Sequence, residues 1–131
     1  MTDETSPYHG HIYYAPDQRP DAEALRNHFI ACTAAGSIPH ILFVGRMMDA
    51  GVGPHPVAQY EIHFLKPSLD DVVAIVEASG LRALIHPLTD DDLADHTTLG
   101  HWIGAPVDLD LSVLDPPGQN QGTARFGKTD F

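Results

Sequence analysis

The sequence predicts an α+β domain in which four strands and two helices follow one another in the order βαββαβ. Two observations carry this prediction. Four short segments have the alternation or the apolar run of a strand, and two longer segments carry apolar residues at helical spacing. Glycine or proline separates these segments. The order is typical of a ferredoxin-like sandwich, in which both helices cover one face of an antiparallel sheet.

The first strand and the first helix open the chain. Alternate side chains of a strand share a face, and in the strand over residues 8–14 one face carries His9, His11 and Tyr13. The helix expected over residues 21–35 has Pro20 near its start and Gly36 as its stop. The two elements together form the first βα unit.

The second and third strands follow, and the third has the most regular alternation in the chain. The apolar run over residues 41–48 has the length of a strand rather than of a helix. In the strand over residues 57–64, the apolar face carries Ala58, Tyr60, Ile62 and Phe64. The opposite face carries Val57, Gln59, Glu61 and His63. This strand therefore presents a carboxylate and an imidazole on one side and a core surface on the other.

A second helix and a fourth strand complete the pattern, and further elements follow. The helix begins after Ser68 and stops at Gly80, and residues 81–86 form the fourth strand. Thr89 is expected to cap a short helix over residues 90–99.

The alternation over residues 107–113 predicts a fifth strand or an extended arm. From residue 115 onward the chain is rich in Gly, Pro, Gln and Asn, which is typical of a tail with little core of its own. We expect one domain over residues 1–114 and a C-terminal tail over residues 115–131.

Charge and composition exclude several classes of function. With 18 acidic and 7 basic residues the net charge is −11, so neither nucleic acid nor an anionic membrane surface is expected as a partner. No segment has the roughly 18 apolar residues of a membrane span, and the N-terminus lacks the pattern of a secretory signal. The single cysteine, Cys32, forms no internal disulfide, and a cytoplasmic location is expected. No nucleophile or phosphate-loop motif is present.

Nine histidines are spread along the chain, and the predicted topology brings several of them together. The first strand lies between the third and the fourth, and neighbouring strands are about 4.8 Å apart. The sheet face without helices receives side chains from the first and third strands, namely His9, His11, Tyr13, Gln59, Glu61 and His63. His86 of the fourth strand joins them if it points to the side opposite Ala83 and Ile85. Imidazoles and a carboxylate are expected to converge there.

Such a convergence admits a metal site and a metal-free alternative. Two histidines and one carboxylate with open positions suit non-haem Fe(II), and an all-histidine set suits zinc. In the alternative, the histidines and Glu61 form hydrogen bonds with polar neighbours on the sheet and bind no metal.

Three segments resemble the small fungal and bacterial DOPA 4,5-dioxygenase-like family. They read Tyr-His-Gly-His-Ile-Tyr-Tyr at residues 8–14, Gly-Pro-His-Pro-Val-Ala-Gln-Tyr-Glu-Ile-His-Phe at 53–64, and His-Pro-Leu-Thr-Asp-Asp-Asp-Leu-Ala-Asp-His-Thr at 86–97, followed by Trp-Ile-Gly at 102–104. The resemblance implies extradiol cleavage of a catechol such as L-DOPA with O₂ and non-haem Fe(II), although Zn or Ni is also possible in a crystal. The substrate and the choice between 4,5- and 2,3-cleavage stay open.

The resemblance carries six histidines over to this chain, namely His9, His11, His55, His63, His86 and His96. The strand geometry favours His11, His63 and either Glu61 or His86 as metal ligands. His55 and His96 are expected to exchange protons with the substrate, with His9 and Tyr13 as further catalytic residues. Arg82 or Arg46 is a candidate partner for a substrate carboxylate.

Two other functions compete with the dioxygenase. One is a metal-binding module that performs no oxygenation, and the other is a metal-free dimer that binds a small aromatic ligand. A bare sheet face is also rarely left in contact with water, so we expect a homodimer to which the arm over residues 107–113 contributes.

Overall fold

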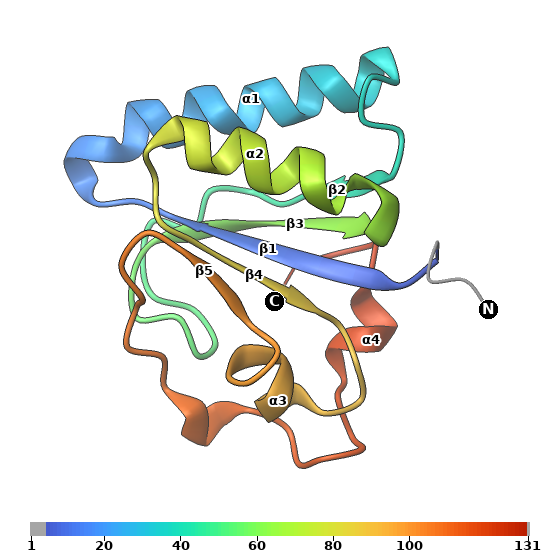
Figure 1. Ribbon diagram of the computed structural model, residues 1–131. Helices are drawn as coiled ribbons and strands as arrows, with labels where there is room; N and C mark the ends of the chain where they lie inside the picture. The colour runs from blue at the N-terminus through green and yellow to red at the C-terminus, as the bar shows by residue number, and fades with distance from the viewer. Residues whose placement is uncertain (1–4, 131) are drawn as a thin grey trace.

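The computed structural model describes residues 5–130 as a five-stranded antiparallel sheet with two long helices on one face (Figure 1). The strands are β1 (Pro7–Tyr13), β2 (Ile41–Val44), β3 (Gln59–Leu65), β4 (Ala83–Pro87) and β5 (His101–Ile103). The helices are α1 (Arg19–Ala35), α2 (Leu69–Ser79), α3 (Asp92–His96) and α4 (Gly122–Arg125). Short 3₁₀ turns lie at Pro16–Gln18, Lys66–Ser68 and Leu111–Val113.

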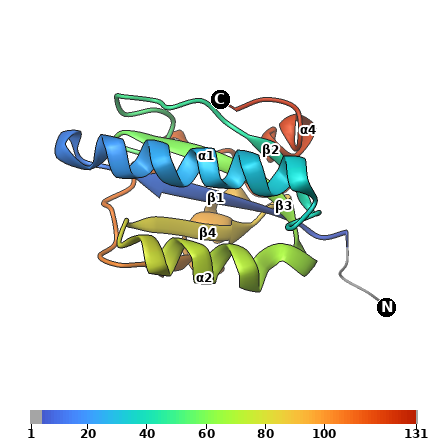
Figure 2. The same cartoon turned by 90° about the horizontal axis from the view of Figure 1, so that it is seen from above.

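The strand order is β2-β3-β1-β4-β5, which confirms the predicted ferredoxin-like core. β1 lies between β3 and β4, β2 is an edge, and β5 extends the sheet beyond β4. Seen from above, α1 and α2 lie side by side over the same face (Figure 2). The predicted glycine stops are also confirmed, because Gly36 and Gly80 end the two helices at φ values of 75° and 77°.

The main core fills the space between the sheet and the two long helices. Apolar side chains from one face of β1, β3 and β4 meet those of the helices, and the fully buried members include Ile12, Tyr60, Ile62, Phe64, Phe29, Val72 and Val76. Burial of these groups is the main source of stability in a domain of this size. It also determines that the opposite faces of the same strands point away from α1 and α2.

After β4, two predictions are wrong, namely the strand alternative for residues 107–113 and the cap at Thr89. The fifth strand is His101–Ile103, which pairs with β4, and not residues 107–113. Those residues alternate because Val107 and Leu109 pack against Tyr13 and Leu84 on the second face of the sheet. The short helix is capped by the Asp91 carboxylate and not by Thr89, whose hydroxyl donates to Asp95 instead.

The second sheet face is covered by the C-terminal part of this same chain. α3, α4 and the loops around them lie beneath the sheet, on the side opposite α1 and α2 (Figure 1). The expectation of a homodimer was based on a bare sheet face. The C-terminal segment covers that face, so this reason for a dimer no longer applies, and the homodimer stays a prediction. Within residues 5–130, no helix is both long and apolar enough to cross a membrane.

Gly10 separates His9 from His11, and its position leaves no room for a side chain. A Cβ atom there would lie 3.0 Å from Ile62 Cγ1 and 3.1 Å from Ile85 Cδ1. We expect Gly10→Val to lower the free energy of unfolding by roughly 1–3 kcal/mol through overpacking. Chemical denaturation measures this change. Ala78→Val, at an exposed position of α2, is the control and should change it by less than about 1 kcal/mol. Equal changes in both variants would contradict the account of Gly10.

Candidate metal centre

The register of three strands gathers the histidines on the second face of the sheet. His9 of β1 lies opposite His63 of β3 and opposite His86 of β4, and His11 lies opposite Glu61. Directly opposed residues of an antiparallel pair point to the same side, so these side chains share one face. The predicted convergence of strand residues is therefore present, and all of these side chains are buried.

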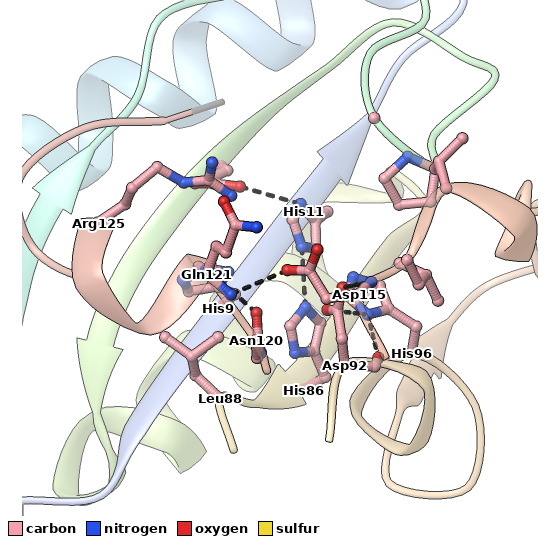
Figure 3. Close-up of a pocket in the computed structure, with 16 residues that line it drawn as sticks. His9, His11, His86, Leu88, Asp92, His96, Asp115, Asn120, Gln121 and Arg125 are labelled. Atoms are coloured by element: carbon pink, nitrogen blue, oxygen red, sulfur yellow. Dashed lines mark hydrogen bonds and ion pairs between the residues drawn. The ribbon is translucent and has the colours of Figure 1, made fainter. Parts of the chain in front are cut away.

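A pocket of about 250 Å³ opens beside these residues (Figure 3). Its lining includes His9, His11, Glu61 and His86 from the strands and His96 from α3. The C-terminal segment supplies the opposite wall with Asp115, Asn120, Gln121 and Arg125. The volume lies below the roughly 300–1,000 Å³ of pockets for drug-sized ligands, so the ligand that fits is small.

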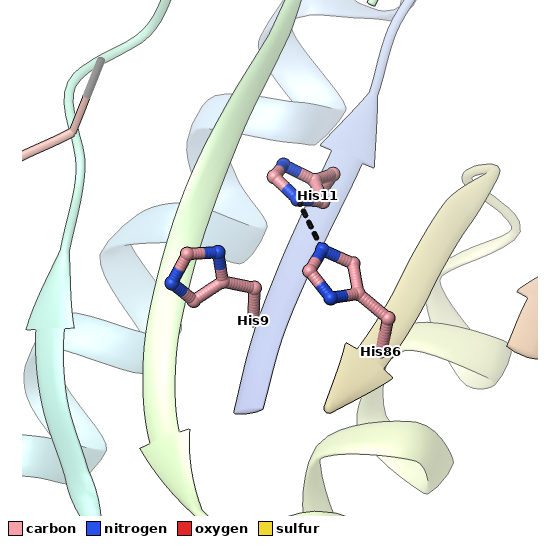
Figure 4. Close-up of side chains that lie close together, drawn as sticks. All are labelled: His9, His11 and His86. Carbon is pink, nitrogen blue, oxygen red and sulfur yellow. Dashed lines mark hydrogen bonds between the residues drawn. The ribbon is translucent and has the colours of Figure 1, made fainter. Parts of the chain in front are cut away.

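The imidazoles of His11 and His86 face each other at the base of the pocket, with their Nε2 atoms 2.9 Å apart (Figure 4). The Nδ1 of His86 donates to the Pro87 carbonyl at 2.7 Å, which leaves a lone pair on its Nε2. The Nδ1 of His11 faces Gln59 Oε1 at 3.2 Å and Glu61 Oε2 at 3.5 Å. Because both oxygens are acceptors, Nδ1 of His11 carries the proton, and its Nε2 also presents a lone pair.

The contact between His11 Nε2 and His86 Nε2 is a hydrogen bond only if one of the two nitrogens carries a proton, and with both protons on the Nδ1 atoms two lone pairs would face each other at 2.9 Å. Burial, reinforced by the neighbouring imidazoles, holds the pKa values of His11 and His86 well below the ordinary value, so a proton does not fill that place at neutral pH. Two nitrogens that bind one divalent ion at about 2.0–2.1 Å lie roughly 2.9 Å apart at the right angle of octahedral coordination and roughly 3.3 Å apart at the tetrahedral angle. The donor types and the spacing therefore fit a metal ion.

His9 completes a group of three nitrogens. One ligand atom from each of His9, His11 and His86 lies within 4.8 Å of the others. The Nε2 of His9 is buried and has no hydrogen-bond partner among the residues that the structure describes. A buried polar atom without a partner is costly, and a bound ion would remove that cost. His11, His55 and His96 form a second such group, which shares His11 with the first.

Glu61 and His63 are close to this group, but both nitrogens of His63 are already engaged. Its Nε2 lies 2.6 Å from Glu61 Oε1, and its Nδ1 accepts the backbone N–H of Gly127 at 2.8 Å. A backbone amide only donates, so the proton of neutral His63 is on Nε2 and is donated to Glu61. The sequence favoured His63 as a metal ligand, and one ligand atom from each of His9, Glu61 and His63 also lies within 4.8 Å of the others. With both nitrogens of His63 engaged, His63 as a ligand stays a prediction.

His96 lines the pocket, whereas His55 does not line it and lies beside His11, with the two ring centroids 4.1 Å apart. The Tyr13 hydroxyl lies 2.7 Å from His55 Nδ1, and burial raises the pKa of Tyr13, so the hydroxyl keeps its proton and donates it. Burial also lowers the pKa of His55 to about 3, which keeps its ring neutral.

His96 is held by Asp92. Its Nδ1 donates to the Asp92 backbone carbonyl at 2.8 Å and lies 3.3 Å from the Asp92 carboxylate. Burial disfavours the charged ring, but these interactions with Asp92 outweigh it and raise the pKa of His96. His96 is therefore the histidine of this group whose surroundings favour binding a proton.

The structure also shows site residues that the sequence did not indicate. Arg125 is the one lysine or arginine among the described residues that line the pocket, whereas Arg82 and Arg46 do not line it. Burial lowers the pKa of His9, and the neighbouring histidines and then Arg125 add to that shift. Arg125 and His9 line the same pocket. Nothing in the composition of the C-terminal segment could have singled out Arg125.

These features define a small α+β protein with a histidine-lined pocket that fits a metal ion. Residues 8–113 match the Dopa 4,5-dioxygenase family, and the chain belongs to that family. A solved structure from Nostoc punctiforme, provisionally described as a dioxygenase, has the same fold, with a TM-score of 0.71 at 30% identity over 84% of this chain and 91% of that one.

Two curated fungal relatives are longer than this chain. The DOPA 4,5-dioxygenase of Amanita muscaria is 29% identical over 119 residues, which cover 87% of this chain and 52% of the relative. An uncharacterised 21.2 kDa protein of Botryotinia fuckeliana is 31% identical over 83 residues, covering 56% of this chain and 45% of the relative. The chain thus spans about half the length of the curated relatives it matches.

The facing nitrogens of His11 and His86 lead to a binding prediction. We expect His11→Ala and His86→Ala to weaken Co(II) binding by more than the roughly 10–100-fold typical of residues outside the coordination shell. Titration of the metal-free protein, followed by visible absorption, measures this affinity. His28→Ala removes an exposed histidine of α1 and should leave the affinity unchanged. Unaltered binding in the His86 variant would exclude the site between these two rings.

Proposed function

We propose that this protein is an extradiol dioxygenase that opens the ring of a catechol such as L-DOPA, using O₂ and a non-haem Fe(II) ion. Membership of the Dopa 4,5-dioxygenase family and the name of the Amanita muscaria relative support the reaction class. The observation that carries the proposal is the pair of opposed lone pairs on His11 and His86, with the buried His9 beside them. A homodimer and a cytoplasmic location belong to the same proposal.

In this proposal His9, His11 and His86 hold the metal, which differs from the set favoured by the sequence. Glu61 and His63 do not bind the metal in this proposal. One nitrogen of His63 is hydrogen-bonded to Glu61, and the other accepts the Gly127 amide. An Fe(II) ion held there would bring the catechol and O₂ together and lower the pKa of a bound hydroxyl group.

The remaining residues act on protons and on substrate position. His96, with its Nδ1–H held by Asp92, presents Nε2 to the pocket and is suited to take a proton from a catechol hydroxyl and to return it. The Tyr13 hydroxyl donates to Nδ1 of His55. The proton of the neutral His55 ring is therefore on Nε2, which can act as a hydrogen-bond donor. The C-terminal segment over the pocket excludes water, which strengthens each of these polar interactions.

Turnover under air tests the proposed reaction. The protein is loaded with Fe(II) without oxygen, and L-DOPA and air are then added. We expect a yellow semialdehyde product and the uptake of one O₂ per substrate, because both oxygen atoms enter the product. His11→Ala should abolish both signals, whereas His28→Ala should retain them. Iron binding with no turnover of any catechol would leave the metal-binding module that performs no oxygenation as the better account.

Arg125 is proposed to bind the carboxylate of a catechol amino acid. We expect Arg125→Met to lower kcat/KM for L-DOPA roughly tenfold, the lower end of the range for a lost charge-assisted hydrogen bond at an exposed side chain. Dopamine, which lacks the carboxylate, should be turned over equally well by the wild type and the variant. Arg46→Met is the matched control, since Arg46 does not line the pocket. An equal loss for both substrates would show that Arg125 does not bind the substrate carboxylate.

A further inference from the structure

Glu61 lies between two buried imidazoles and contacts one with each oxygen. Its Oε1 is 2.6 Å from His63 Nε2, and its Oε2 is 3.5 Å from His11 Nδ1. The three side chains are at most 4% exposed. Removing a carboxylate from water is costly unless donors or positive charges lie close to it; here His63 Nε2–H donates to it, and the N–H of His11 points toward it from 3.5 Å. Glu61 therefore connects His63 to the ring that faces His86.

The C-terminal segment extends this connection by one hydrogen bond. The backbone N–H of Gly127 donates to His63 Nδ1 at 2.8 Å, across 64 positions of sequence. The neighbouring Phe126 ring stacks on His63 with a centroid distance of 5.4 Å and an interplanar angle of 13°. The His63 ring in turn stacks on His9 at 4.2 Å and 9°. One short segment thus determines both the tautomer and the plane of His63.

We propose that the Gly127 amide, His63 and Glu61 form a hydrogen-bonded chain that orients the His11 ring as a metal ligand, and that Phe126 and Gly127 close this chain from the C-terminal segment. The inference rests on the metal centre of the proposed function. It assigns Glu61 and His63 as positioning residues: Gly127 places the His63 proton on Nε2, and His63 holds Glu61 with its Oε2 3.5 Å from His11 Nδ1. The negative charge of Glu61 and the hydrogen bond to Gln59 Oε1 at 3.2 Å both keep the His11 proton on Nδ1. His11 Nε2 then presents its lone pair toward His86.

This arrangement has a physical precedent in metal sites generally. A histidine ligand usually donates its second N–H to a carboxylate or a carbonyl, which fixes its tautomer, and loss of that partner weakens metal binding about 10–100-fold. His86 obeys the rule through the Pro87 carbonyl, which lies next to it in sequence. His11 obeys it through Gln59 Oε1, with the Glu61 carboxylate 3.5 Å away, and that carboxylate is held by His63 and so depends on the C-terminal segment. The C-terminal segment is therefore expected to tune metal affinity without binding the metal.

Two substitutions of His63 separate a positioning role from ligation and from packing. In His63→Gln the side-chain amide can still donate to Glu61 and accept from Gly127, whereas His63→Phe keeps a stacked ring and loses both hydrogen bonds. We expect Co(II) affinity to change less than about threefold in His63→Gln and to fall about 10–100-fold in His63→Phe. Glu61→Gln should lose affinity as His63→Phe does, because an amide cannot accept from both rings. Circular dichroism checks that each variant is folded.

Equal and large losses in His63→Gln and His63→Phe would make His63 a ligand and overturn this inference alone. Unchanged affinity in His63→Phe and Glu61→Gln would also overturn it. A wild-type protein that binds no Co(II) would overturn the metal centre together with this inference, whereas metal binding without catechol turnover would overturn only the proposed reaction.

A second measurement does not depend on the variants folding. Long-range ¹H–¹⁵N spectra of the histidines in the Zn(II)-loaded wild type report which ring nitrogen carries the proton. The proposal predicts a proton on Nε2 of His63 and on Nδ1 of His11. A proton on Nδ1 of His63, or zinc on its Nε2, would contradict it.

Discussion

The site depends first on the register of β1 against its two neighbours. His9 is opposed by His63 on one side and by His86 on the other, and His11 is opposed by Glu61. A shift of one residue would turn every one of these side chains toward the apolar core. The same register places Gly10 against Ile62 and Ile85, where only a hydrogen atom fits. The core packing that stabilises the sheet is therefore also what holds the imidazoles together.

Buried polar groups need hydrogen-bond partners, and residues close to the histidines in the folded chain supply most of them. Pro87, Asp92, Tyr13 and Gly127 each supply a partner to one of the histidines. Among the described residues, His9 Nε2 is one of four buried side-chain atoms without a hydrogen-bond partner, and the spacing of the facing nitrogens of His11 and His86 fits a cation. Our proposal uses these contacts to separate the ligands, His9, His11 and His86, from the positioning residues, Glu61 and His63.

The sequence could predict the sheet face but not the contacts made across it. Period-two alternation in β1 and β3 was enough to place His9, His11, Glu61 and His63 on one side. It could not show that Gly127 donates to His63, because a contact across 64 positions depends on how the C-terminal segment folds back. The strand predicted for residues 107–113 was wrong for a related reason. Alternation also arises where a segment packs against a sheet face, as Val107 and Leu109 do, without pairing in it.

Anomalous diffraction from crystals of the Fe(II)-loaded protein, recorded at the iron edge, tests the central claim most directly. The account predicts one iron peak at bonding distance from Nε2 of His11 and Nε2 of His86, with His9 as the third ligand. His63 should remain hydrogen-bonded to Glu61 and Gly127. A peak bonded to His63 or to Glu61, or the absence of any iron between His11 and His86, would contradict it.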